Sequence, residues 1–435
     1  MKTITYEAAE AQPETVSAFL MLVLEYAQEQ GVFSLMERLV QIKMKEVIYS
    51  RLQKAQTIIT SLVMGCKHTQ DINAVLSDER AAANYLWMNR FPDQSQINRY
   101  LTRFEADNVE QLGEVHAQMF ERQSQARRAM GQIVVDIDQC GLVVSGQSYE
   151  LARKGYFPRK RGEKGYQVSA AYIGAYEEAL QIYLDPGNTP CTQRLPDLLR
   201  DIDRLLQRDN PAVTVIRRLD GGYDSSTHRQ QLADLPGYFL LKGGDSRTAT
   251  RLAATVPLHH WLPVAEAVHG VELTPEGSVR RLLYEFWLAD DRCEYALLYT
   301  NLPPDQLGVQ AAFDFYNERT TIEAFFAASR SVFNIQSMRS RQFHAIFAFL
   351  RFVFLTHNLI HWAKQSRLSG SALVQATTRT LVTHLARVRA TVTWDGAWHL
   401  AILPSSRWAT LLLQTLSHPP GPVQLELPFA RLHKT

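Results

Sequence analysis

The order of strand-like and helix-like segments between residues 131 and 242 constrains the fold more than any other feature. The first segment, Gln132–Asp138, is a β-branched run that ends in an acid, and the apolar Leu142–Val144 follows it. Two further runs, at 166–173 and 178–184, contain β-branched and aromatic residues, which is typical of strands. Three strands in succession predict an antiparallel meander.

Helices and single strands alternate after this meander. Leu195–Gln207 has helical apolar spacing, and Val213–Asp220 is a fourth strand that again ends in an acid. A short helix over 226–233 then precedes a fifth strand over 238–242. A three-strand meander followed by helix, strand, helix and strand is the segment order of a ribonuclease-H-like α/β core. We therefore predict an α/β fold with a ribonuclease-H-like catalytic core.

The chain on either side of this stretch predicts further regions. The N-terminal part has helical spacing, and Asp93 or Ser95 is placed to cap the helix that follows Pro92. Its pattern alone leaves DNA binding, dimerisation and scaffolding open. β-like segments over residues 244–308 predict an insertion into the core. An Asp-Gly turn within 391–402 predicts a terminal hairpin. The predicted regions are an all-α N-terminal domain at 1–128, the first part of the core at 129–243, a β-rich insertion at 244–308, the second part of the core at 309–365, and a helical C-terminal region at 366–435 that ends in a β-hairpin and serves dimerisation or DNA contact.

Composition excludes several classes of protein. The formal net charge of +2 on 435 residues means that any basic footprint must be local. The four cysteines are far apart and lack metal-ligand spacing, which predicts reduced thiols in a cytosolic protein. The most apolar run, 345–360, is interrupted by Arg351, His357 and Asn358, so it predicts a buried helix and no membrane span. The first residues carry acids and no apolar stretch typical of a signal peptide.

One stretch, Phe315–Arg330, is predicted to be a helix with a mixed chemical face. At roughly 100° per residue, four polar side chains fall within about 60° of one another. They are a phenol, two guanidiniums and a carboxylate: Tyr316, Arg319, Glu323 and Arg330. The aliphatic and aromatic residues between them fall on the other side, where they can pack into a core.

Acids at strand ends supply candidate metal ligands. Asp138 and Asp220 end neighbouring strands of the predicted core, so both carboxylates are expected at one rim of the sheet, where Glu323 approaches them. Three gathered carboxylates repel one another unless a cation lies among them, and hard oxygen ligands select Mg²⁺ or Mn²⁺. Two such ions about 3.5–4 Å apart activate a water or a 3′-hydroxyl at a phosphodiester. This pattern predicts metal-dependent phosphoryl transfer on nucleic acid.

Structural interpretations of these acids stay open. A single Asp at a strand end commonly caps a turn or helix, and a single Glu on a helix is commonly solvated. Asp136 lies two residues before Asp138 on the same strand face and is an alternative first ligand. Asp224 is predicted to cap the short helix that follows it, with metal contact as the alternative.

The segment between the first two strands, residues 153–164, is predicted to be a basic DNA-binding loop. It holds six cations, one acid and two aromatics, and its glycines and proline favour a loop. Such a loop matches the charge of a DNA backbone, although phosphate contacts do not specify bases. The candidate cations are Arg153, Lys154, Arg159, Lys160, Arg161 and Lys164.

Taken together, these residues resemble a known family. Tyr316-x2-Arg319-x3-Glu323-x6-Arg330 resembles the Y-R-E-K signature of DDE transposases from bacterial insertion sequences, family four and its relatives. Asp136–Cys140 with the later Gly-Gln resembles the D-x-D-x-T…G-Q element of one branch, and Arg218–Tyr223 resembles its R-x-D-x-G-aromatic run. The chain departs from the pattern at Arg330, where the family has Lys, and at Cys140, where it has Thr.

The resemblance implies a metal-binding triad of Asp138, Asp220 and Glu323 that holds two Mg²⁺ or Mn²⁺ ions. It implies that Tyr316, Arg319 and Arg330 hold DNA phosphates, and that an aromatic of the insertion, for which Trp287 is the candidate, stacks on a flipped base. The alternative for Trp287 is a core position. The reaction implied is hydrolytic cleavage at transposon ends followed by attack of the 3′-hydroxyl on target DNA.

The resemblance also implies partners and a location. The N-terminal helices would bind ends that carry terminal inverted repeats, and two subunits would form a homodimer on paired ends. The location implied is the bacterial cytoplasm, on the nucleoid and with no membrane partner. The rival interpretations are a ribonuclease-H-like nuclease or resolvase that cuts without joining, and an inactive transposase-derived DNA-binding protein. A glycosidase with a carboxylate pair is a third.

Overall fold

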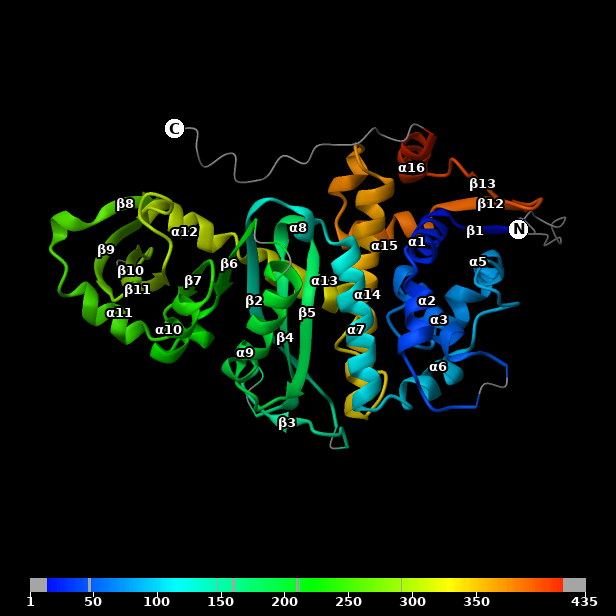
Figure 1. Cartoon of the computed structure of the whole chain (residues 1–435), viewed down its shortest axis with the longest axis horizontal. Coiled ribbons are helices and arrows are strands. Elements are labelled where there is room, and N and C mark those ends of the chain that lie inside the picture. The colour runs from blue at the N-terminus through cyan, green and yellow to red at the C-terminus, as the bar shows by residue number, and fades with distance from the viewer. Residues whose placement is uncertain are drawn as a thin grey trace, which may run out of the picture. The chain divides into compact units, whose positions relative to one another are not determined.

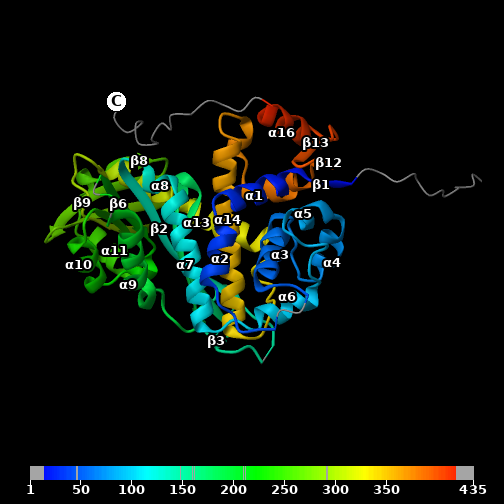
Figure 2. The same cartoon turned by 45° about the vertical axis from the view of Figure 1, so that its right-hand side comes forward.

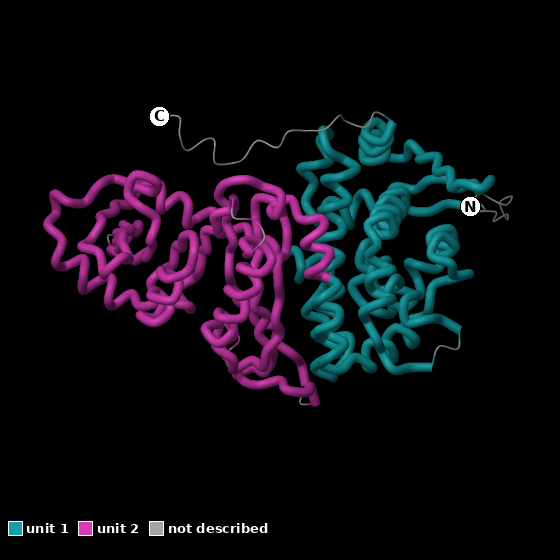
Figure 3. Tube along the Cα trace, viewed as in Figure 1, with its two compact units in different colours: residues 1–115, 328–425 teal, residues 116–327, 426–435 magenta. Residues whose placement is uncertain are grey.

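A computed structural model of the chain describes residues 14–45, 48–146, 148–158, 160, 162–208, 210, 212–290 and 292–417. It divides into two compact units, which Figure 3 colours separately. One unit comprises residues 116–327 with 426–435, and the other comprises residues 1–115 with 328–425. Two helices, α7 (Ala106–Gln123) and α13 (Thr320–Ser331), cross the division.

The unit formed by residues 116–327 contains a ten-stranded mixed sheet (Figure 1). Its central strands are ordered β5-β4-β2-β6-β7. Strand β4 is antiparallel to β2 and β5, whereas β6 is parallel to both β2 and β7. This order and these directions are consistent with the predicted ribonuclease-H-like core. The bounds are β2 Gly131–Val143, β4 Lys164–Ile173, β5 Glu178–Pro186, β6 Val213–Leu219 and β7 Tyr238–Lys242.

Two helices connect the later strands of this core, as the sequence predicts. Helix α9 (Cys191–Ile202) continues into a π-helical turn before β6, and α10 (Ser226–Asp234) precedes β7. The prediction that Asp224 caps α10 is wrong, because Ser225 Oγ accepts from the His228 amide instead. Asp224 pairs with Arg229 and accepts a hydrogen bond from the Gly244 amide at 2.9 Å.

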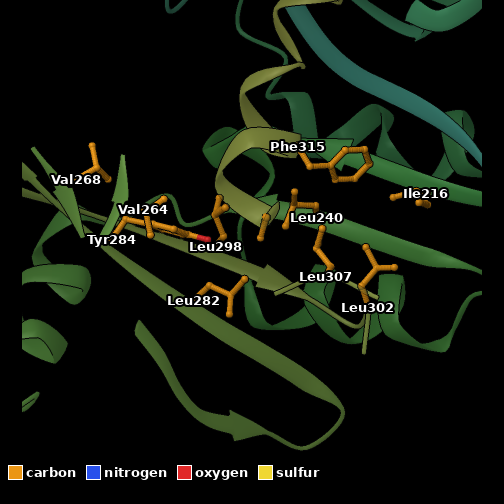
Figure 4. Close-up of a cluster of buried hydrophobic side chains, with 11 residues drawn as sticks. Ile216, Leu240, Val264, Val268, Leu282, Tyr284, Leu298, Leu302, Leu307 and Phe315 are labelled. Atoms are coloured by element: carbon orange, nitrogen blue, oxygen red, sulfur yellow. The ribbon is translucent and has the colours of Figure 1, made fainter. Parts of the chain in front are cut away.

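The inserted segment extends the core sheet. After α11 (Ser246–Ala253), strands β8 to β11 follow as an antiparallel series, and β11 pairs antiparallel with β7. Figure 4 shows side chains of β6, β7 and these strands packed with Phe315 of α12 (Val309–Asn317) in one hydrophobic cluster. The strand bounds are β8 Leu262–Ala265, β9 Val268–Glu276, β10 Val279–Trp287 and β11 Cys293–Thr300. The five-region functional layout stays a prediction.

The other unit combines the N-terminal and C-terminal helices. Strand β1 (Thr15–Ser17) pairs with β12 (Arg389–Trp394), which forms the predicted hairpin with β13 (Trp398–Ile402). The predicted cap at Asp93 is confirmed, since its Oδ1 accepts from the Ser95 and Gln96 amides at 2.9 and 3.0 Å. The N-terminal helices are α1 Ala18–Glu29, α2 Val32–Leu39, α3 Arg51–Val63, α4 Asp71–Val75, α5 Arg80–Tyr85 and α6 Gln94–Leu101.

The longest helix of this unit is α14 (Phe343–Arg367), which packs against α1 and α3 (Figures 1 and 2). It is the one described helix that is long and apolar enough to cross a membrane, but 83% of its apolar window is buried inside the protein. Its composition is therefore explained by its place in the core, as the sequence predicts.

The start of the predicted helical C-terminal region, residues 371–388, is not one helix. The structure has three short pieces there, a 3₁₀ turn at Ala372–Gln375, α15 (Thr378–Thr383) and a 3₁₀ turn at Leu385–Arg387. Thr377 interrupts the helical segment. Its hydroxyl oxygen accepts from the Thr380 amide at 3.3 Å and caps the start of α15. The prediction that this region ends in a β-hairpin is wrong, because a further helix, α16 (Arg407–Ser417), follows the hairpin. Residues 418–435 of the predicted region lie outside the described residues.

Candidate active site

The two aspartates lie at the rim where β6 stops. Strand β6 pairs with β2 only as far as Leu219, which faces Ile137. Asp220 follows β6 directly, and Asp138 is the first residue of β2 beyond this pairing. The prediction that Asp138 ends its strand is wrong, since β2 continues to Val143 beside β4. Both acids nevertheless reach the same rim.

The stretch predicted as one helix is two helices. Helix α12 ends at Asn317 and α13 begins at Thr320, so Arg319 lies in the turn between them. In a continuous helix the Arg319 amide would donate to the Phe315 carbonyl, four residues earlier. The Arg319 amide donates instead to the Tyr316 carbonyl at 3.0 Å, because the Arg218 guanidinium donates to the Phe315 carbonyl. A side chain from β6 therefore interrupts the helix at this point.

Arg319 lies among the acids that were predicted to bind metal. Its Nη1 is 3.1 Å from Asp138 Oδ2, and its Nη2 is 2.9 Å from Glu323 Oε1. Burial lowers the pKa of the guanidinium, but the charges of Asp138, Tyr316 and Asp220 outweigh burial and raise that pKa. The site thus gathers its carboxylates around one guanidinium.

The three acids differ in exposure and in partners. The Asp138 side chain is 18% exposed, whereas that of Glu323 is 58% exposed. Burial raises the pKa of the Asp138 carboxyl, and the Arg319 charge opposes that rise. Asp220 accepts a hydrogen bond from the Tyr316 hydroxyl at 3.3 Å. Burial also raises the pKa of the Tyr316 phenol, and the nearby Asp220 charge adds to this effect.

Asp136, the alternative first ligand, is already bound to other side chains. Arg218 donates to both of its oxygens, at 2.7 and 3.0 Å, and the Thr321 hydroxyl donates to Oδ2 at 2.8 Å. The carboxylate is completely buried, which raises its pKa despite the Arg218 charge. Asp136 therefore links β2 to β6 and to the start of α13, and the geometry favours Asp138 as the first ligand.

Sequence reasoning missed the roles of Arg218 and Thr321. In the sequence, Arg218 stands out only as part of the R-x-D-x-G-aromatic run, although its guanidinium ties Asp136 to the end of α12. Its position two residues before Asp220 was the available signal. Thr321 gave no signal, because its contact with Asp136 joins residues 185 positions apart.

The other predicted residues lie elsewhere. Arg330 is in the last turn of α13, in the part of that helix assigned to the other unit. Trp287 ends β10 and is 47% exposed, which excludes the core position, and its Nε1 donates to Glu285 at 2.9 Å.

The basic segment is partly a strand. Arg153 and Lys154 form β3, which pairs with Gly165 and Lys164 of β4. Lys160 is exposed. Arg159 and Arg161 lie outside the described residues, as does the Gln of the Gly-Gln element.

The donor set at the rim fits a divalent cation in chemistry. Asp138, Asp220 and Glu323 supply hard carboxylate oxygens, the ligands that Mg²⁺ and Mn²⁺ take. Within the ranges that the structure describes, no three acidic, His or Cys side chains have the spacing of a metal centre. Arg319 explains why these carboxylates lack that spacing, because its guanidinium lies between Asp138 and Glu323.

A comparison with known families supplies the class of this protein. Residues 129–359 match the family described as "Transposase DDE domain". This match includes β2, β6 and α13, which carry the three acids, and it spans more than half of the chain. The chain therefore belongs to the DDE transposase domain family.

Similar solved structures are also transposases, at low similarity. The piggyBac transposase synaptic complex with hairpin DNA is 10% identical with a TM-score of 0.45, and the match covers 96% of this chain and 89% of that one. The Mos1 mariner paired-end complexes with Mn and with Mg are 15% and 12% identical, with TM-scores of 0.18 and 0.15. Those matches cover 50% of this chain and 65% and 75% of the others. No curated protein matches the chain.

Proposed function

We propose that this chain is a DNA transposase that cleaves transposon ends by metal-dependent phosphodiester hydrolysis and joins the 3′-hydroxyl ends to target DNA. One observation carries the proposal. Asp138 and Asp220 lie at one rim, and Arg319 draws Glu323 to Asp138 through ion pairs of 2.9 and 3.1 Å. In a chain of the DDE family, this arrangement supports these three acids as the catalytic residues.

Asp138, Asp220 and Glu323 would hold two Mg²⁺ or Mn²⁺ ions. When bound, such ions supply an activated nucleophile and stabilise the leaving oxygen. The partly exposed Asp138 carboxylate and the largely exposed Glu323 carboxylate share the Arg319 guanidinium in this structure, so the rim already stabilises positive charge. Asp136 stays with Arg218 and Thr321 and positions the start of α13.

Arg319 has two roles in this proposal. Without metal, its guanidinium neutralises Asp138 and Glu323, which would otherwise repel each other. If Asp138 and Glu323 held a divalent cation, the Arg319 guanidinium would be free to bind a phosphate, for which its planar donors are well suited. Tyr316 and Arg330 would also contact DNA phosphates, with the Tyr316 hydroxyl leaving Asp220.

The partners and location follow as proposals. The DNA partners would be transposon ends with terminal inverted repeats and target DNA, bound by a homodimer on paired ends. The N-terminal helices would bind the ends, and Trp287, which is 47% exposed, would stack on a flipped base. The location would be the bacterial cytoplasm, on the nucleoid.

The test uses DNA from the two flanks of the coding region, searched first for inverted repeats. The full chain is incubated with labelled end DNA, a target plasmid and Mg²⁺ or Mn²⁺, and the products are separated on gels. We expect cleavage at the ends and a joined product that carries the labelled 3′ end. Cleavage without joining would favour the nuclease or resolvase, and binding without cleavage would favour the inactive DNA-binding protein.

A further inference from the structure

An exposed aromatic side chain stands within the basic segment between β2 and β4. Tyr156 is 84% exposed and follows β3 by two residues. A tyrosine ring that is mostly exposed to water adds no burial energy to the fold, so packing does not explain the position of Tyr156. The backbone beside it is held firmly, which makes the exposure a property of the structure.

The next residue, Phe157, anchors the segment on the sheet. Its buried ring lies against three glycines that no other residue type can replace without a clash. A Cβ would lie 2.5 Å from the ring at Gly141, 3.0 Å at Gly165 and 2.9 Å at Gly187. Phe157 therefore points into the sheet, and the adjacent Tyr156 ring is left in solvent.

A buried side chain fixes the backbone of Tyr156 as well. Gln167 is 5% exposed, and its Nε2 donates to the Tyr156 carbonyl at 3.2 Å and to the Gly187 carbonyl at 3.1 Å. A ring on a fixed backbone loses little conformational entropy when it binds a ligand, which favours recognition.

The charges around the ring define the ligand class. Arg153, Lys154 and Lys160 are exposed, and they form no ion pair with another residue in the described ranges. An exposed aromatic ring among unpaired cations is the combination that binds single-stranded nucleic acid, because bases stack on the ring while cations follow the phosphates. A duplex interior does not offer the face of a base, so the ring selects an unpaired nucleotide.

The basic segment lies beyond the acids along β2 and β4. Gln167 pairs with Gly141, three residues beyond Asp138, and β2 ends at Val143, five residues beyond it. At about 3.4 Å per residue these positions are roughly 10 and 17 Å along the strand from Asp138. Figure 1 shows β3 at the far end of these strands.

We propose that Tyr156 stacks on an unpaired base of DNA bound at this end of β2 and β4, with Arg153, Lys154 and Lys160 on the flanking phosphates. This proposal rests on the proposed function only in that the substrate is DNA. Gly141 and Gln167 face the side of the sheet opposite to Asp138, so the ring holds the strand and does not touch the reacting atoms.

The experiment measures stacking directly. The full chain, in EDTA to prevent cleavage, is titrated into a short single-stranded oligonucleotide that carries one 2-aminopurine, whose fluorescence is quenched by stacking. Tyr156→Ala should abolish the quenching and weaken single-strand affinity about 5- to 100-fold, while duplex affinity is unchanged. Tyr156→Phe keeps the ring and should behave as the wild type.

Two further variants separate the sources of binding. Lys154→Ala should weaken single-stranded and duplex DNA alike and reduce the salt dependence of both, because it acts on phosphates. If Trp287→Ala abolishes the quenching and Tyr156→Ala does not, the stacked base lies at Trp287 and the proposal is overturned. Unchanged single-strand affinity in Tyr156→Ala also overturns it, whereas a wild-type chain that binds no DNA would overturn the proposed function itself.

Discussion

Two arginine–carboxylate clusters, two residues apart on β2, have opposite properties. The Arg218–Asp136 cluster is buried, and Asp136 accepts three hydrogen bonds from Arg218 and Thr321. The Arg319 cluster joins a partly exposed Asp138 to a largely exposed Glu323. The first cluster fixes the helix junction, whereas the second leaves carboxylate oxygens accessible. The same chemical pair thus serves structure in one place and an exchangeable cation site in the other.

The largest expected effect is on chemistry at the exposed cluster. Glu323→Gln keeps the shape and removes the charge, so cleavage should fall about 10³-fold, because bound metal supplies several kcal/mol to the transition state. DNA affinity and thermal stability should stay at the wild-type level. The matched control is Glu318→Gln, since the Glu318 side chain is 68% exposed and its Oε2 lies 3.5 Å from Arg218 Nη1. Cleavage by Glu323→Gln at the rate of the control would remove Glu323 from the site.

The buried cluster should show the reverse pattern. Arg218→Ala leaves Asp136 buried without its cation and frees the Phe315 carbonyl, so the free energy of unfolding should fall by about 3–5 kcal/mol. Urea denaturation measures this loss. Arg200→Ala is the control, because that ion pair with Asp197 is exposed and its loss should cost less than about 1 kcal/mol. Equal losses in the two variants would contradict the structural role of Arg218.

Arg319 tests whether the exposed cluster exchanges its cation. Without metal, Arg319→Ala should destabilise the chain by about 1–3 kcal/mol, because it leaves the Asp138 carboxylate, which is 18% exposed, without its partner. Added Mg²⁺ or Mn²⁺ should raise the melting temperature of this variant more than that of the wild type, since no guanidinium competes for Asp138 and Glu323. The measurement is a melting curve at increasing metal concentration. Identical metal-induced shifts in both proteins would show that Arg319 does not compete with metal.

The difference between the two clusters marks the limit of prediction from sequence. Strand β7 and the Asp93 cap were predicted because local patterns determine them. The break at Arg319 was not, because it depends on Arg218, whose partner Phe315 is 97 positions away. Asp136 and Asp138 looked equivalent for the same reason, since only distant residues make one of them buried and paired.

A third arginine–carboxylate pair, Glu79–Arg389 in the other unit, is expected to give the smallest change in stability. Glu79 is 1% exposed, pairs with Arg389 and accepts from the Ser17 amide at 2.9 Å. Burial nevertheless raises the pKa of its carboxyl above the ordinary 4.5, although both partners oppose the rise. The folded state then binds the proton more tightly than the unfolded state, so stability from this group is present at low pH and is lost as pH rises through the raised pKa.

Glu79→Gln removes this titration and isolates the contribution of the pair. Urea denaturation is measured at a series of pH values from 4.5 upward, the window in which the folded carboxyl titrates. The stability of the wild type relative to Glu79→Gln should decrease with rising pH, because only the wild type must then carry a buried charge. A difference that grows with pH would mean that Arg389 more than compensates for burial. That result would separate Glu79 from Asp138, at which burial raises the carboxyl pKa despite the Arg319 charge.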